Sequence, residues 1–205
     1  MDALGIAERS GNDMALAFAR VALGTALVQR RTTAERDRGQ TFLAEVSDVF
    51  TRHAHNLGDR PLVDVLVARG MARRGDRDEA IQRMRASTDR LITEGQLLGW
   101  GVPATGFLVE TLLERGAEGD VAEADAAPAA GARRPPPSMP AIERLRAAPV
   151  DADLAIRDIW LLRLRALLAR AHGDEAGYRD YRDRYRDKAR TLGFEGHIGW
   201  AAAMP

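Results

Sequence analysis

Apolar residues recur with the period of an α-helix along most of this 205-residue chain. In the stretch NDMALAFARVALGTALVQRR, one apolar stripe follows successive helical turns through Met14, Phe18, Val21, Thr25 and Val28. A second stripe on the same segment runs through Leu16, Leu23 and Leu27. Two stripes predict a helix that is buried on two sides, as happens inside a stack of helices.

Strand patterns are missing from the sequence. No segment shows the strict apolar–polar alternation of a half-buried strand bounded by turns. Near the C-terminus, LAIRDIWLLRLRALLARAHG is again helical in period, and we expect Ile156, Trp160, Leu164 and Leu167 to face inward. The sequence therefore predicts an all-α fold of stacked antiparallel helix hairpins, in the manner of a tetratricopeptide-like α-solenoid.

Two Gly-Asp pairs indicate where one helix ends and the next begins. They are Gly75-Asp76 and Gly173-Asp174. Glycine favours the left-handed conformation that ends a helix, and aspartate can cap the helix that follows. Each pair therefore predicts a tight connection between two neighbouring helices.

Proline and capping residues predict further helix starts. Pro61 and Pro103 suit the first turns of helices expected over 61–74 and 101–116, because the N–H that proline lacks has no intrahelical partner there. Near the N-terminus, Asn12 or Asp13 is expected to cap the first long helix, and Thr33 the second.

One stretch departs from the helical pattern. Residues 128–140 contain five prolines, a glycine and several alanines. Proline removes a backbone donor and obstructs the preceding helical turn, so this stretch predicts a flexible or polyproline-like linker. It divides the chain into helical repeat regions at 1–127 and 141–205.

Composition argues against several classes of function. The formal net charge is zero, which does not favour attraction to nucleic acid over long distances. Cysteine is absent, so the chain has neither thiolate ligands nor a cysteine nucleophile. The N-terminal residues lack the apolar run of a signal peptide, and no stretch approaches the roughly 20 apolar residues of a membrane span. We expect a cytoplasmic protein without membrane contact.

The C-terminal stretch EGHIGW offers a histidine next to a glutamate, which could be part of a catalytic site. An internal comparison favours a packing role instead. ARRGDRDEA at 72–80 is followed by EGQLLGW at 94–100, and ARAHGDEAG at 169–177 is followed by EGHIGW at 195–200. His197 then corresponds to Gln96 or Leu97, neither of which performs acid–base chemistry. The comparison predicts a helix–helix turn followed by a packing tryptophan, Trp200, and a His197 that can be replaced at little cost.

Other candidate sites also have structural interpretations. His53 and His55 could bind a metal, but a His-x-His spacing points to different sides of a helix. The tripeptide Arg74-Gly75-Asp76 could suggest integrin adhesion, although a helix end explains it. A P-loop is excluded because Lys188, the only lysine, lacks the Gly-Lys-Ser/Thr context.

Three tyrosines recur among arginines in the segment GYRDYRDRYRDKA. Tyr178, Tyr181 and Tyr185 could stack on nucleic-acid bases. Aspartates alternate with the arginines, however, and Asp180 can pair with Arg184 one turn later. We therefore favour a stripe of packing tyrosines beside a solvated charged face, with no direct nucleic-acid contact.

Three segments resemble the C-terminal tetratricopeptide-like region of large actinobacterial signalling proteins: ARRGDRDEAI, EGQLLGWGVPATGFLVETLLERGAEGDVAEA and LARAHGDEAGYRDYRDRYRDKARTLGFEGHIGWAAAMP. Those proteins also carry a class III adenylate cyclase domain, or an ATPase and a LuxR-type DNA-binding module. The resemblance covers roughly 12–127 and 141–205. None of the family's catalytic motifs occurs in this chain, so no catalytic, cofactor-binding or metal-binding residue is carried over.

The resemblance implies a non-catalytic scaffold or regulatory segment. Its partner would be a protein, a peptide, or a cyclase or ATPase domain, and no cofactor is expected. An alternative from another class is a sensor that binds a small effector between helices.

Overall fold

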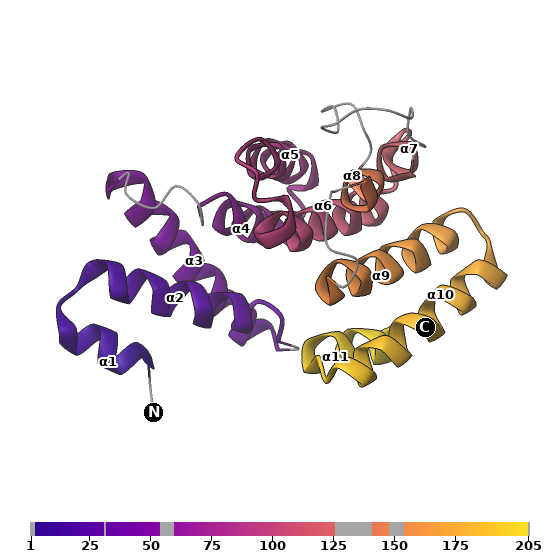
Figure 1. Cartoon of the computed structure of the whole chain (residues 1–205). Helices are drawn as coiled ribbons and strands as arrows, with labels where there is room; N and C mark the ends of the chain where they lie inside the picture. Colours follow the sequence, from indigo (N-terminus) through magenta and orange to yellow (C-terminus); the bar gives the residue numbers. More distant parts are fainter. Residues whose placement is uncertain (1–2, 31, 54–59, 126–140, 148–153, 205) are drawn as a thin grey trace. The chain divides into compact units, whose positions relative to one another are not determined.

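A computed structural model describes residues 3–30, 32–53, 60–125, 141–147 and 154–204, and all regular structure in these ranges is helical (Figure 1). The contacts between residues divide the chain into two compact units, Met1–Ser87 and Thr88–Pro205. We describe each unit by itself. Within the described ranges, no helix combines the length and hydrophobicity needed to cross a bilayer.

Helices that are neighbours in sequence pack together in pairs. The first unit contains α1 (Ala3–Ser10), α2 (Asp13–Leu27), α3 (Thr33–His53), α4 (Arg60–Arg74) and the greater part of α5 (Arg77–Thr93). The second unit contains the end of α5, the π-helical turn η1 (Leu97–Gly101), α6 (Val102–Arg115), α7 (Asp120–Asp125), α8 (Ala141–Ala147), α9 (Ala155–Ala171), α10 (Glu175–Leu192) and α11 (Glu195–Ala203). The predicted all-α class is confirmed for the described residues.

The predicted helix ends at the Gly-Asp pairs are confirmed. Gly75 and Gly173 follow the ends of α4 and α9 and have φ angles of 112° and 73°, which a residue with a side chain rarely adopts. Asp174 caps α10, because its Oδ1 accepts a hydrogen bond from the Gly177 N–H at 2.9 Å. The integrin-like tripeptide is therefore the junction between α4 and α5.

Capping at the N-terminal helices differs in one place from the prediction. Asn12 caps α2, and its side chain accepts from the backbone N–H groups of Met14 and Ala15. The predicted Thr33 cap of α3 is wrong, because the Thr32 hydroxyl accepts from the Glu35 N–H at 3.3 Å. Thr32 also donates to the Glu35 carboxylate at 2.5 Å. Glu35 lies three residues beyond Thr32, which is the spacing of a capping box, but its carboxylate accepts from the Thr32 hydroxyl and not from the backbone N–H.

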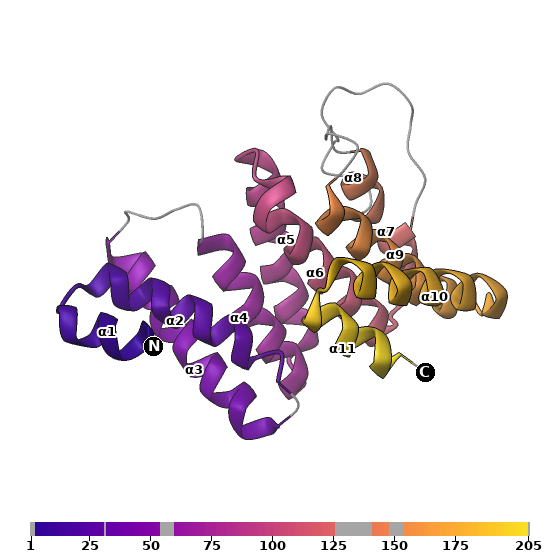
Figure 2. The ribbon, with the colours of Figure 1, turned by 60° about the horizontal axis from the view of Figure 1, so that its bottom comes forward.

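In the first unit, α2 packs against α3, and α3 packs in turn against α4 (Figures 1 and 2). The first of these two contacts is unusually close. A Cβ atom added to Gly39 of α3 would lie 2.8 Å from the Val28 nitrogen and 2.9 Å from the Gly24 oxygen, both in α2 or at its end. Small residues thus allow the two backbones to meet.

This close approach explains why one predicted inward position is wrong. Phe18 keeps 45% of its surface exposed and touches Phe50 edge to face at 6.4 Å. Val28 of the predicted stripe is buried, and the other buried positions of α2 are the small residues Ala17 and Gly24. The helix pairs through its smallest residues, because these permit the shortest distance between the helix axes, and the large Phe18 ring is displaced to the side.

We expect Gly39→Ala to destabilise the α2–α3 pair by about 1–3 kcal/mol, the usual cost of overpacking. The added methyl group meets backbone atoms, which cannot rotate away. Gly199→Ala in α11 is the matched control, because open space surrounds Gly199 and alanine favours a helix. Urea denaturation followed by circular dichroism would compare the two variants. Equal stability of both would contradict the close crossing.

The second unit is organised around α6, which contacts α7, α8 and α9. A run from Val102 to Leu112 includes ten buried residues, so α6 is covered on nearly all sides. The helix has Pro103 in its first turn and ends at Arg115, and Gly116 follows it in the left-handed conformation, as predicted for 101–116. A tight hairpin of α9 and α10 follows, and α11 folds back onto α10 (Figure 2).

The proline-rich segment at 128–140 lies outside the described residues, and its role as a linker stays a prediction. The helices on either side of it pack together in the second unit, where α8 and α9 contact both α6 and α7. The division between the compact units lies at Ser87 and Thr88.

Candidate functional site

The EGHIGW stretch is helical. α10 ends at Leu192, Gly193 adopts the left-handed conformation with φ 65°, and α11 begins at Glu195. The predicted helix–helix turn over these residues is therefore wrong, because the turn lies just before them. The predicted packing of Trp200 is confirmed, because its ring is half-buried and contacts Trp160. His197 and Ala201 of the same helix are buried.

Aromatic rings surround His197 on several sides. Ring centroids lie 5.4 Å away for Trp160 of α9, 5.0 Å for Trp200 of α11 and 5.8 Å for Tyr185 of α10. All three contacts are edge to face, the geometry that aromatic quadrupoles favour. Only 8% of the His197 surface is exposed. This burial argues against the expectation that His197 can be replaced at little cost.

A hydrogen bond fixes the orientation of the imidazole. The Tyr185 hydroxyl lies 2.9 Å from His197 Nδ1. Tyr185 is itself fully buried, with no exposed surface. A neutral imidazole can accept this hydrogen bond at Nδ1 while its other nitrogen carries the proton.

A buried ion pair borders the ring cluster. Arg163 Nε of α9 donates to Glu110 Oε1 of α6 at 2.6 Å. The same guanidinium lies 4.8 Å from the Trp200 ring centre and 5.9 Å from that of Tyr185. Arg163 thus joins α6, α10 and α11 through a charge-assisted hydrogen bond and cation–π contacts. We call these residues, with His197 and Trp160, the Arg163–His197 cluster.

Burial and charge shift the pKa values in the cluster. Burial lowers the pKa of His197 to about 4, and the positive charge of Arg163 acts in the same direction, while Glu110 opposes it. Burial also raises the pKa of Tyr185 to about 12, although Arg163 opposes this shift. For Arg163, burial alone would lower the pKa, but the carboxylate of Glu110 raises it above its usual range. At neutral pH the cluster holds a neutral imidazole, a neutral phenol and a paired guanidinium.

The arrangement does not make a general acid–base pair of Glu195 and His197. Glu195 is exposed in the first turn of α11, and His197 points into the core with Tyr185 as its hydrogen-bond partner. A histidine whose pKa is far below neutrality carries little of the protonated form that a general acid needs. The geometry is that of a packing cluster.

Glu110 and Arg163 were not identified from the sequence. Glu110 interrupts the apolar run FLVETLL, and Arg163 interrupts the apolar run IWLLRLRALL. A charged residue at such a position is buried only when it is paired. That signal could have suggested that the two residues face one another, although it could not have matched them across the intervening chain.

The tyrosines and charged residues of α10 that the sequence singled out have structural roles. Tyr178 and Tyr185 are buried and Tyr181 is half-buried, so the packing interpretation of the tyrosine stripe is confirmed. Arg184 pairs with Asp180 at 3.1 Å, as predicted. Lys188 pairs with Asp158 of α9 at 2.9 Å and helps to lower the pKa of that carboxyl group, although burial opposes the shift.

The proposed histidine metal site cannot be placed. His53 is the last residue of α3, and His55 lies outside the described residues. Among the residues that are described, no three His, Asp or Glu side chains gather as potential ligands of one metal ion.

Comparisons with protein-family models, curated proteins and solved structures found no match to this chain.

Proposed function

We propose that the chain is a non-catalytic helical segment that scaffolds or regulates a protein partner in the cytoplasm. The observation that carries the proposal is the Arg163–His197 cluster. The histidine that could have served as an acid or base is buried among rings and bonded to Tyr185, and the nearest buried charges pair with each other. The polar groups of the Arg163–His197 cluster stabilise helix packing, so they are not available to a substrate.

The paired helices support the finer proposal of tetratricopeptide-like stacking. Hairpins such as α2–α3 and α9–α10 are the units from which helical arrays are built, and such arrays present helix surfaces to peptides or other domains. The partner we propose is a protein or peptide, with a class III cyclase domain or a LuxR-type ATPase domain as the first choice, in line with the resemblance of the sequence. Because the chain has no net charge, binding should depend only weakly on salt.

We expect the purified chain neither to hydrolyse ATP nor to form cyclic AMP with magnesium or manganese. The sequence lacks a P-loop lysine, and the candidate histidine is held in the core. Turnover would be measured for the wild type and for Glu110→Gln and His197→Gln variants. Activity that survives repeated purification and disappears in either variant would overturn the proposal, because a contaminant would not respond to the substitutions.

The partner itself can be tested by direct binding. Purified cyclase and ATPase domains would be passed over the immobilised chain, with an unrelated protein of similar size and charge as the control. Trp100 is a good position at which to test partner binding, because 44% of its surface is exposed and tryptophan often anchors interfaces. Saturable binding that Trp100→Ala weakens would support the scaffold role. Absence of binding to both domains would remove this class of partner.

A further inference from the structure

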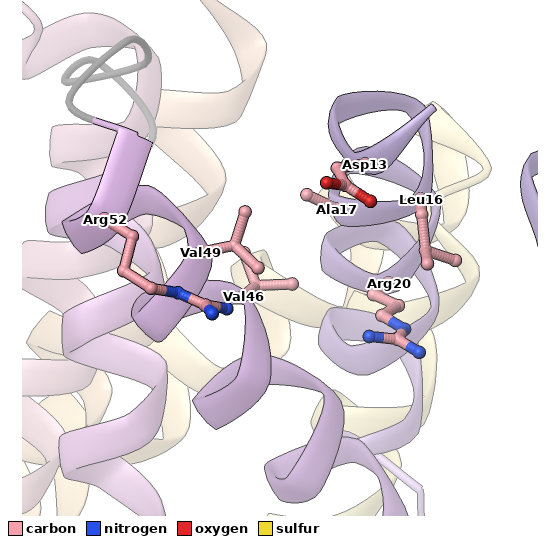
Figure 3. A pocket seen from close by; sticks show the side chains of 7 residues that line it. All are labelled: Asp13, Leu16, Ala17, Arg20, Val46, Val49 and Arg52. Carbon is pink, nitrogen blue, oxygen red and sulfur yellow. The ribbon is translucent and has the colours of Figure 1, made fainter. Parts of the chain in front are cut away.

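A cavity of about 310 Å³ lies between α2 and α3 in the first unit (Figure 3). The volume is at the lower end of the range for small-molecule sites. Its walls come from both helices: Asp13, Leu16, Ala17, Arg20, Val46, Val49 and Arg52. All of these residues belong to one compact unit.

The middle of the cavity is aliphatic. Leu16 and Ala17 contribute from α2, and Val46 and Val49 contribute from α3 (Figure 3). Ala17 and Val46 are almost fully buried, whereas Leu16 and Val49 are half-buried. Such walls favour a short hydrocarbon group, because burying it releases water from apolar surface on both sides.

Charged side chains flank the aliphatic walls of the cavity. In Figure 3 Arg52 lies on the α3 side, whereas Arg20 and Asp13 lie on the α2 side. Arg20 Nη1 pairs with Glu45 at 2.8 Å. Among the described residues, Arg52 has no ion pair, and its Nε donates only to the Asp48 carbonyl at 3.4 Å. Glu45 thus neutralises Arg20, and the Arg52 guanidinium supplies the positive charge of the cavity wall.

We propose that the cavity binds a small aliphatic carboxylate. The hydrocarbon chain packs against the Leu16, Val46 and Val49 side chains. The carboxylate accepts hydrogen bonds from the Arg52 guanidinium. Asp13 repels a carboxylate from the α2 side of the cavity, so the carboxylate of the ligand faces Arg52 on the α3 side.

The charge of the site selects among ligands. One uncompensated positive charge matches a monoanion better than a doubly charged phosphate. An uncharged hydrocarbon or alcohol fills the aliphatic part but leaves Arg52 without a counter-charge. This binding role is independent of the protein partner proposed above, and it would give the chain a sensor for a small organic acid.

The test is a titration of the full ¹⁵N-labelled chain with hexanoate, followed by amide chemical shifts. We expect saturable shifts at the Ala17, Val46 and Val49 amides. Hexan-1-ol at the same concentrations should produce much weaker binding. Absence of shifts at these amides, or equal binding of the alcohol, would overturn the proposal.

Arg52→Gln is the decisive variant, because Arg52 is exposed and can be changed without disturbing the core. We expect it to weaken hexanoate binding about tenfold, the usual scale for one charge-assisted hydrogen bond. Arg77→Gln is the matched control, since Arg77 is an exposed arginine of the same unit that does not line the cavity. Equal effects of the two substitutions would overturn the proposal.

A second variant tests the aliphatic part of the site. Val49→Phe places a larger side chain in the cavity wall, and we expect hexanoate binding to be lost while the circular dichroism spectrum stays helical. Undiminished binding in this variant would place the ligand elsewhere and overturn the proposal. None of these measurements involves a protein partner, so their outcome is separate from that of the scaffold proposal.

Discussion

Replacing Trp160 with alanine is expected to lower the free energy of unfolding by about 3–5 kcal/mol, the usual range for truncating a buried aromatic residue. Trp160 is only 2% exposed. Its ring meets Phe107 at 5.4 Å and Trp200 at 5.5 Å, both in edge contacts. It also covers Gly106, where an added Cβ would lie 2.3 Å from the Trp160 ring. The variant therefore loses contacts with α6 and α11 together.

Trp100→Ala is the control for this measurement. Trp100 is the same residue type in the same unit, but 44% of its surface is exposed. Urea denaturation of both variants, followed by circular dichroism at helical wavelengths, would compare their stabilities. A similar loss for the two tryptophans would contradict the central position that the structure gives to Trp160.

Removing one partner of the buried ion pair is expected to have the second large effect. Glu110→Gln should lower the free energy of unfolding by about 3 kcal/mol, because it leaves the Arg163 charge buried and without its carboxylate. The side chains of Arg163 and Glu110 are only 13% and 5% exposed, so water cannot fully replace the lost partner. Asp180→Asn is the matched control, since the Asp180–Arg184 pair is exposed and should change stability little.

A double-mutant cycle would separate the pair from the cost of each substitution. Glu110→Leu combined with Arg163→Met should be more stable than the sum of the two single changes predicts, because no unpaired charge then remains in the core. Strict additivity would mean that the two side chains do not stabilise each other, contrary to the 2.6 Å contact between them.

Helix positions could be predicted because local residues determine them. Gly75, Gly173 and Pro103 act through their own backbone conformations, and their helix ends lie where the sequence placed them. The face that each helix buries depends on its neighbour. α2 turns Ala17 and Gly24 toward α3 because these small residues allow close approach, so the period of its large residues was a poor guide to Phe18.

The two stretches EGQLLGW and EGHIGW place their tryptophans differently for a physical reason. Six residue steps separate Glu94 from Trp100, whereas five separate Glu195 from Trp200. One extra residue rotates a helical side chain by about 100°. The first copy also contains the π-helical turn η1, with Gly99 outside helical φ/ψ values. Similar letters therefore give an exposed Trp100 and a half-buried Trp200.

The environment of His197 could not be predicted, because it is built by distant parts of the chain. Trp160 and Arg163 come from α9, Tyr185 comes from α10, and Glu110 comes from α6. The sequence offered only the neighbouring glutamate as a partner. The true hydrogen-bond partner is Tyr185, which lies twelve residues away in sequence.

Burial of His197 also makes the free energy of unfolding depend on pH. Its pKa is about 4 in the folded chain and close to the ordinary value of 6.5 when unfolded. Between these values the unfolded state binds more protons, so this group makes stability rise with pH across the window. Its contribution is fully present above about 6.5 and is lost as the pH falls toward 4.

The most direct test of a packing role for His197 is its titration by NMR in the folded protein. The chain has four histidines, and comparison with His197→Gln assigns the ring signal. A neutral, buried imidazole predicts a midpoint near 4, with no change in the signal between neutral pH and the ordinary histidine range. A midpoint near 6.5 would show that the ring is open to water and would contradict the account of His197 as a residue of the core.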